Sequence, residues 1–189
     1  MVFNLSIVQF MKPGVRITII FSSVLLALAG CGKSYMVSKS QEIVFQVEFF
    51  NTSDSSSLKG FYIDVNGNIL TYESPKKWHF PDNDQIIKKA DLKSNLSVTK
   101  TAYDKVPNDE LQKYVKYIDN IAASKVTLPK IHHHRKGTLS FYCYQYSEGA
   151  EEYKRTLIRS EGYINCENLN FFSKKAVSWL LETEKSKIR

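Results

Sequence analysis

The sequence has no apolar run long enough to cross a lipid bilayer, which takes about 20 consecutive, predominantly apolar residues. Its longest apolar segment extends only from Ile17 to Leu28 and is interrupted by Thr18, Ser22 and Ser23. Cysteine is also scarce, with three among 189 residues. These two absences exclude a spanning helix in this segment and a scaffold held together mainly by disulfide bonds.

Sequence motifs of several enzyme classes are absent as well. There is no Gly-x-Ser-x-Gly nucleophile elbow, no glycine-rich phosphate loop and no His-Glu-x-x-His zinc motif. His79 is the only histidine outside a single cluster, and no serine or cysteine beside it is placed as a nucleophile. The sequence therefore predicts no cofactor and favours a binding protein over an enzyme, although catalytic groups that meet only in space leave no such motif.

The first thirty residues have the layout of a secretory signal peptide. Lys12 and Arg16 form a short basic region, the apolar run follows, and the small residues Ala29 and Gly30 lead into Cys31. This order predicts export of the remaining chain from the cytoplasm.

The tetrapeptide Leu28-Ala29-Gly30-Cys31 resembles the lipobox of bacterial lipoproteins. The resemblance implies cleavage just before Cys31 and acylation of this cysteine, so that lipid chains hold the protein on a membrane. It also implies residence in the bacterial envelope. Gly32 stands where an aspartate can retain a lipoprotein in the inner membrane, which favours the outer membrane. The alternatives are an ordinary signal peptide with a chance cysteine and a short buried helix.

The sequence predicts three parts: a signal peptide over 1–30, a lipidated tether over 31–41 and a single domain over 42–189. Translation is expected to start at Met11, because the ten residues before it carry no charge. Removing 1–30 takes away two of the 26 basic residues and none of the 19 acidic ones. The remaining positive charge is modest and interspersed with acids, so nucleic acid is not an expected partner.

The periodicity of the domain predicts an α+β fold. An apolar strand is expected near 43–50, a hairpin around Asn66-Gly67, and a second hairpin over 137–162. Apolar residues three and four apart predict amphipathic helices over 108–124 and 171–185. We therefore expect an antiparallel sheet of two hairpins and an N-terminal strand, with two main helices packed on one face.

The segment 74–95 is expected to be mostly loop, with one helical turn at 85–89. Within it, Asp82 and Asp84 fall at two positions of a pattern similar to the EF-hand calcium loop. The pattern fails at its first and sixth positions, where Phe80 and Gln85 replace the acid and the glycine. A polar turn leading into a short helix is the favoured interpretation.

Three adjacent histidines form a second candidate metal site. In an extended chain His132 and His134 point the same way and are suited to share a zinc ion. No third ligand has the right spacing, so a solvated basic loop is favoured. His132, His134, Asp82 and Asp84 are therefore only weak candidates, and no metal is expected.

Cys143 and Cys166 are candidates for a disulfide bond outside the cytoplasm, although two separate buried thiols would fit the sequence as well. In "LSFYCYQY" the alternation places Tyr142, Tyr144 and Tyr146 on one face of a strand. Such a row is a candidate binding face for a sugar or a peptide. The alternative is that the three rings lie beneath a helix or pair across the sheet.

Together these features predict a lipid-anchored, non-enzymatic binding or accessory domain of the bacterial envelope. Its expected partners are the membrane, through the lipid, and an unknown protein or glycan. The two hairpins and the closing helix with Trp179 are also similar to small bacterial lipoproteins, a resemblance that brings no activity with it. An immunity-like or inhibitor lipoprotein against an exported enzyme is one alternative. An envelope hydrolase is the other. Its only candidate catalytic pair that is close in the sequence is His79 with either Asp82 or Asp84.

Overall fold

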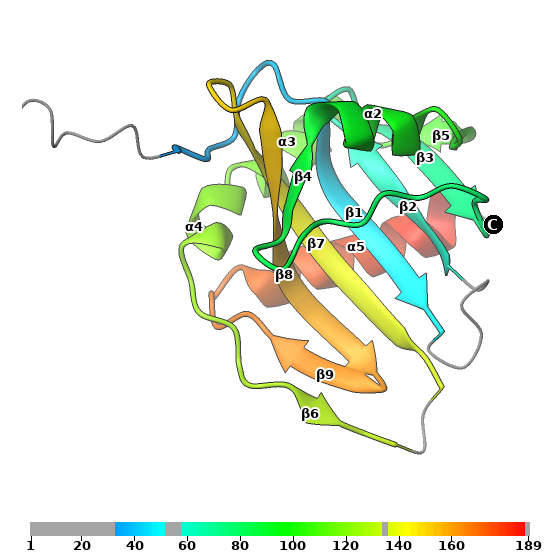
Figure 1. Ribbon diagram of the computed structural model, residues 1–189, viewed down its shortest axis with the longest axis vertical. Helices are drawn as coiled ribbons and strands as arrows, with labels where there is room; N and C mark the ends of the chain where they lie inside the picture. The colour runs from blue at the N-terminus through cyan, green and yellow to red at the C-terminus, as the bar shows by residue number, and fades with distance from the viewer. Residues whose placement is uncertain (1–32, 52–57, 134–135, 188–189) are drawn as a thin grey trace, which may run out of the picture. The chain divides into compact units, whose positions relative to one another are not determined.

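The computed structural model describes residues 33–51, 58–133 and 136–187. Ser34–Arg189 forms one compact unit with a mixed α+β fold and a large antiparallel sheet (Figure 1), which confirms the predicted fold class. The strands are β1 (Ile43–Phe50), β2 (Leu58–Asp64), β3 (Asn68–Glu73), β4 (Ile86–Lys88), β5 (Lys100–Lys105), β6 (Lys130–Ile131), β7 (Thr138–Ser147), β8 (Glu152–Gly162) and β9 (Ile164–Glu167). The helices are α2 (Lys89–Leu96), α3 (Asn108–Val115), α4 (Ile118–Ala122) and α5 (Ser173–Lys187).

The strand β1 joins the two predicted hairpins into one sheet. It pairs antiparallel with β2 on one side and with β7 on the other, which gives the order β5-β3-β2-β1-β7-β8-β9-β6, while β4 pairs with β8. The hairpins β2–β3 and β7–β8 are both present, as predicted. At the first turn Gly67 has φ +83°, and a Cβ there would lie 2.2 Å from the Val106 carbonyl oxygen, so the turn requires glycine.

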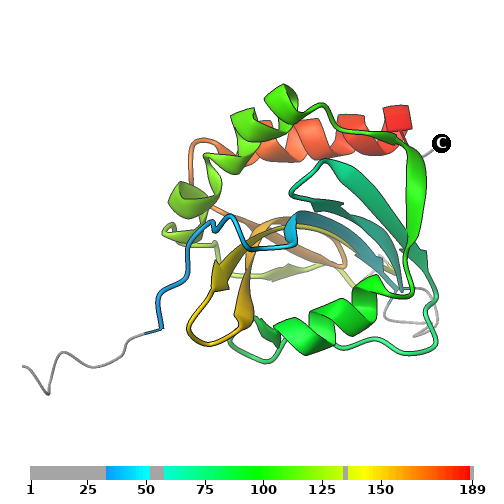
Figure 2. The same ribbon diagram turned by 90° about the horizontal axis from the view of Figure 1, so that it is seen from above.

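Helices cover both faces of the sheet, whereas the sequence predicted main helices on one face only. Figure 2 shows α3 and α5 above the sheet and α2 below it. Under α3, α4 and α5 lies one core cluster, and a second cluster rich in tyrosine lies under α2 and β4. The sequence did not reveal α2 because Leu92 and Leu96 are its only large apolar residues, which is too few for a helical stripe.

The helix predicted over 108–124 is interrupted. The backbone N–H of Tyr117 donates to the Tyr114 carbonyl at 3.0 Å, a tight turn that separates α3 from α4. The apolar stripe nevertheless continues, because Leu111, Ile118 and Ile121 are all buried. The pattern therefore predicted the buried face correctly but not the break between the two helices.

The chain before β1 is docked on the domain from Tyr35 onward, where the Tyr35 hydroxyl donates to the Glu152 carboxylate, although 31–41 was expected to be a tether. Met36 forms a β-bridge with Tyr146, and the Val37 N–H donates to Asp119 Oδ1 of α4 at 3.2 Å. Cys31 and the expected signal peptide lie outside the described residues. Within the part of the chain that is described, no helix has the length and apolar character needed to cross a membrane.

Candidate functional site

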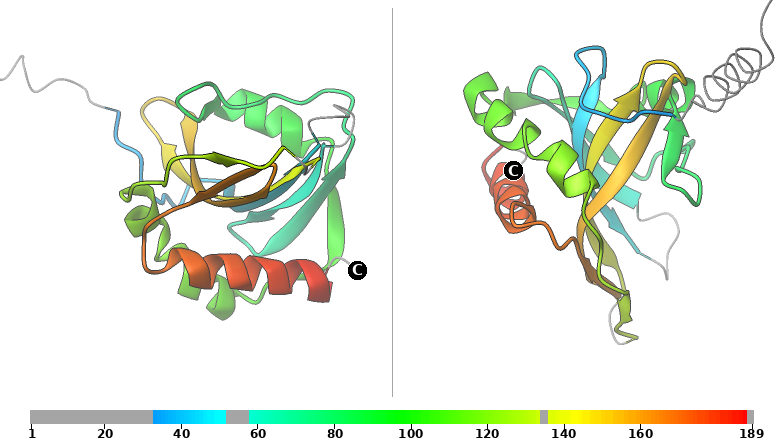
Figure 3. Two further views of the ribbon diagram at one scale, coloured as in Figure 1. Left: turned by 90° about the horizontal axis from the view of Figure 1, so that it is seen from below. Right: turned by 90° about the vertical axis from the view of Figure 1, so that its left-hand side faces the viewer.

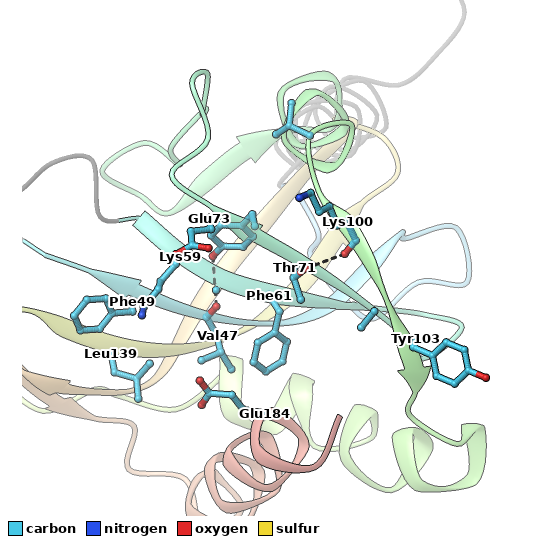
Figure 4. A pocket seen from close by; sticks show the side chains of 14 residues that line it. Val47, Phe49, Lys59, Phe61, Thr71, Glu73, Lys100, Tyr103, Leu139 and Glu184 are labelled. Atoms are coloured by element: carbon cyan, nitrogen blue, oxygen red, sulfur yellow. Dashed lines mark hydrogen bonds between the residues drawn. The ribbon is translucent and has the colours of Figure 1, made fainter. Parts of the chain in front are cut away.

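A groove of about 720 Å³ lies between the sheet and the C-terminal part of α5. Its volume is within the range of about 300–1,000 Å³ that is usual for ligand sites. Figure 4 shows Val47, Phe61 and Leu139 pointing toward the helix that carries Glu184, so these side chains form an apolar floor. Val47 and Phe61 are each 2% exposed and belong to the core, so they close the bottom of the groove, and the partly buried Leu139 is the floor residue with more exposed surface. Further lining residues are Phe49, Lys59, Gly60, Thr71, Tyr72, Glu73, Val98, Lys100, Ala102 and Tyr103.

The register of four strands produces the groove. Val47 lies opposite Phe61, Phe61 opposite Thr71, and Thr71 opposite Lys100, so the four side chains form one row across β1, β2, β3 and β5. The row changes from apolar at the centre of the sheet to polar at its edge. Thr71 Oγ1 donates to the Lys100 carbonyl at 3.0 Å (Figure 4), which holds β5 against β3.

Charges of both signs surround the apolar floor. In the neighbouring row Lys59 lies directly opposite Glu73, and Lys59 Nζ is 5.5 Å from the centre of the Phe49 ring. Lys100 adds a cation from β5, and Glu184 adds a carboxylate from α5. The groove is therefore suited to a ligand that has an apolar body and polar or charged ends.

The described residues that line the groove include no serine, cysteine or histidine. Their ionisable side chains are two lysines, two glutamates and two tyrosines. Burial raises the pKa of one of these, Tyr72, well above its usual value, so its hydroxyl stays protonated and hydrogen-bonded inside the domain. The lining as described offers binding groups and no nucleophile–base pair.

The three tyrosines of β7 share one face of the strand, as predicted, but they do not form an exposed binding face. Tyr144 and Tyr146 are buried, and Tyr142 is half-buried against the same cluster. Ile87 of β4 and Leu92 of α2 belong to this cluster. The row therefore lies beneath a covering layer, which is the alternative that the sequence left open.

A buried ion pair lies beside these tyrosines, and sequence reasoning missed it. Arg155 and Glu48 are 8% and 7% exposed, with Arg155 Nη1 3.6 Å from Glu48 Oε1. Arg155 also donates to Gln85 Oε1 from Nε at 3.1 Å and from Nη2 at 3.0 Å. Its guanidinium carbon is 3.9 Å from the centre of the Tyr142 ring. Arg155 thus connects β1, β7 and β8 to the segment before β4.

The environment of Glu48 is polar but largely shielded from solvent. Burial raises the pKa of Glu48, and the attraction of Arg155 and a hydrogen bond from Gln46 oppose that rise without cancelling it. Gln46 in turn accepts a hydrogen bond from Tyr144 Oη at 2.5 Å and donates one to Tyr72 Oη at 2.8 Å. Gln46 and Glu48 interrupt the apolar sequence "IVFQVEFF", and that interruption was the available sign of a buried polar network.

Of the two alternatives that the sequence left open for Cys143 and Cys166, the structure has separate free thiols and no disulfide between them. Cys143 lies on β7 and Cys166 on β9, with β8 between them, so their backbones are about 10 Å apart across the sheet. Their partners on β8, Thr156 and Ser160, are four residues apart, which adds about 13 Å along the strands. A disulfide requires Cα atoms within about 7 Å.

The weak metal candidates are not brought together. Asp82 Oδ1 accepts hydrogen bonds from the N–H groups of Asp84 and Ile86 at 2.9 and 2.8 Å, so this carboxylate closes a turn. His134 lies outside the described residues. Among the described ones, no group of three or more histidine, cysteine, aspartate or glutamate side chains is placed to hold a metal ion.

His79, the candidate catalytic histidine of the hydrolase alternative, is paired with neither Asp82 nor Asp84. His79 Nδ1 is 3.4 Å from Asp91 Oδ1 at the start of α2. The His79 backbone is held by Asn95, whose side chain accepts from the His79 N–H at 2.8 Å and donates to its carbonyl at 2.7 Å. These contacts fasten the loop 74–85 to α2.

No protein-family model, no curated protein and no solved structure matches this chain. The function is therefore inferred from the groove and from the N-terminal motif.

Proposed function

We propose that this chain is a lipoprotein of the bacterial envelope, held in the outer membrane by acyl chains on Cys31, and that its domain binds an amphipathic ligand in the groove without altering it chemically. The observation that carries the proposal is the apolar floor of Val47, Phe61 and Leu139 beneath charges of both signs. The lipobox supports the anchored location.

A protein segment fits this groove better than a glycan. The groove is bordered by β5, the outermost strand at its end of the sheet. An extended segment is able to pair with such an edge strand and to place alternate side chains in the groove.

Filling the groove should abolish capture of the ligand. Ala102 packs against the core cluster on the groove side of β5, whereas its neighbour Thr101 is exposed and pairs with Leu70 of the other cluster. We expect Ala102→Trp to lower partner recovery about ten-fold or more, and Thr101→Trp to leave recovery unchanged. The measurement is cross-linking of tagged protein in its native membrane, followed by quantitative mass spectrometry of captured chains.

The pair of tryptophan variants separates occupation of the groove from a general effect on the edge strand. Equal recovery from wild type, Ala102→Trp and Thr101→Trp would contradict binding in the groove. If the captured chain is an exported enzyme whose activity falls on binding, the immunity-like alternative gains support over a general accessory role.

Replacement of Cys31 by alanine should abolish both acylation and processing. We expect the intact mass of the wild-type protein to equal that of the chain from Cys31 plus a diacylglyceryl group, with or without one further acyl chain on the amine, whereas Cys31→Ala should retain its N-terminal segment without lipid. Cys166→Ala is the matched control and should be acylated like the wild type. An unmodified mature N-terminus in the wild type would disprove the anchor.

A further inference from the structure

Five exposed apolar side chains lie on two neighbouring chain segments at the other edge of the sheet. Their exposed fractions are 86% for Leu128, 77% for Phe171, 65% for Leu169, 54% for Ile131 and 39% for Val126. We call this set the apolar ridge. Apolar side chains exposed to this degree and gathered in one place commonly mark an interaction surface.

Backbone hydrogen bonds hold the two segments of the ridge side by side. Val126 bridges Asn168, and the Leu169 N–H donates to the Lys125 carbonyl at 2.9 Å. Further along, Ile131 of β6 pairs with Ile164 of β9. Figures 1 and 3 show the chain from α4 to β6 running beside the chain from β9 to α5. The ridge is therefore a fixed feature of the sheet edge.

The charges on these two segments are mostly positive. Across 125–133 and 163–175 there are four lysines and a single acid, Glu167. Glu167 Oε1 is 4.0 Å from Lys174 Nζ, and Lys175 Nζ lies 5.4 Å from the centre of the Phe171 ring. Apolar side chains flanked by lysines are complementary to a surface that is apolar inside and anionic outside.

The ridge lies near the point where the chain leads toward Cys31. The Val37 N–H contacts Asp119 of α4, and the adjacent Asn120 carbonyl accepts a hydrogen bond from Asn170 Nδ2 at 3.0 Å. Asn170 lies between Leu169 and Phe171 of the ridge. Cys31 and Val37 are six positions apart, a distance of at most about 22 Å even when the chain is fully extended.

We propose that the apolar ridge docks on the anionic surface of a lipid bilayer. Leu128, Leu169 and Phe171 enter the headgroup region, and the neighbouring lysines contact anionic headgroups. The proposal rests on the proposed function in one respect, since an acylated Cys31 brings the ridge to the membrane. Two attachments to one bilayer reinforce each other and hold the domain in one orientation, which neither does alone.

The ridge is tested without the anchor, using Ser34–Arg189. This compact unit contains every residue of both core clusters, and a cooperative thermal transition verifies that each variant is folded. The probes are vesicles of phosphatidylcholine alone and vesicles with an equal part of phosphatidylglycerol, separated by flotation. The test variant is Leu128→Glu/Phe171→Glu. Its matched control is Phe80→Glu/Thr101→Glu, which adds the same charge at exposed positions outside both the ridge and the groove.

We expect binding about ten-fold tighter to anionic vesicles than to neutral ones, and weaker binding at high salt. The ridge variant should lose about ten-fold or more of this affinity, and the control should retain it. Absent binding, equal binding to both vesicles, or no effect of the ridge variant would overturn the proposal. A dimer that forms without vesicle binding and is lost in the ridge variant would also overturn it, because a second copy would then cover the ridge.

The result is independent of lipidation, because the tested unit lacks Cys31. Vesicle binding by this unit would stand even if the wild-type chain were found without lipid. Conversely, if the chain is acylated but its domain does not bind anionic vesicles, the lipid anchor stands and docking of the ridge on the bilayer is disproved.

Discussion

Replacement of Arg155 by methionine is expected to lower the free energy of unfolding by about 3–5 kcal/mol near neutral pH. The cost arises because Glu48 stays buried without its guanidinium partner, either as an unpaired anion or after taking up a proton. The variant also loses two hydrogen bonds to Gln85 and the stacking on Tyr142. Chemical unfolding of the purified domain measures the difference.

The loss should shrink as the pH falls. Burial already holds the pKa of Glu48 above its usual value, and Arg155 opposes this rise, so removing Arg155 raises that pKa further. Between the unfolded and the folded pKa the native state binds more protons than the unfolded state. The free energy of unfolding of Arg155→Met therefore increases on acidification, by up to about 1.4 kcal/mol per pH unit.

A double variant separates the buried charge from lost packing. Glu48→Gln/Arg155→Met carries neither charge and should recover a large part of the lost stability, with little dependence on pH. Glu48→Gln alone should be destabilising, since it leaves the Arg155 cation without its carboxylate. If Arg155→Met differs from wild type by less than about 1 kcal/mol at every pH, the buried ion pair does not stabilise the domain as argued.

Replacement of Trp179 by alanine should cost about 3–5 kcal/mol of unfolding free energy, because it leaves a cavity between α5 and the sheet. The indole is buried, with its centre 5.2 Å from the Phe45 ring and 4.2 Å from the Tyr114 ring, on which it stacks. Trp179 Nε1 also donates to Glu110 Oε1 at 2.7 Å. Since Glu184 of α5 lines the groove, ligand capture should fall together with stability.

Two further variants show what the indole contributes. Trp179→Phe keeps most of the buried area and loses the hydrogen bond, so we expect about 1–2 kcal/mol. Trp78→Ala is the matched control, because Trp78 is half-buried against Tyr62 and Tyr72 in the second cluster. It should be less destabilising than Trp179→Ala and leave capture in the groove intact. Equal losses of capture from both alanine variants would contradict a specific role of α5 in the groove.

The hairpins and the amphipathic helices were predictable because their patterns are local. Asn66-Gly67 predicts a tight turn from backbone freedom, and the alternation around Tyr142–Tyr146 predicts one shared face. Such local patterns did not predict features that depend on contacts with distant parts of the chain. Nothing near 89–96 shows that a helix will cover the tyrosines, because α2 contributes few apolar residues. Nothing near Tyr117 shows where the helix stops.

The groove could not be predicted from the sequence for the same reason. Val47, Phe61, Thr71 and Lys100 come from four strands, and only their register brings them into one row. The sequence left the pairing of Cys143 with Cys166 open, because spacing along the chain does not show which strand lies between two cysteines.

The sequence by itself determined the class of the fold, the positions of both hairpins and the faces that helices 108–124 and 171–185 bury. These follow from periodicity and turn chemistry within short windows. The tertiary structure alone decided that Arg155 meets Glu48, that the tyrosines are covered, that a groove opens beside α5 and that an apolar ridge stays exposed at the β6 edge. Each of these depends on contacts between residues far apart in the chain, which local preferences do not encode.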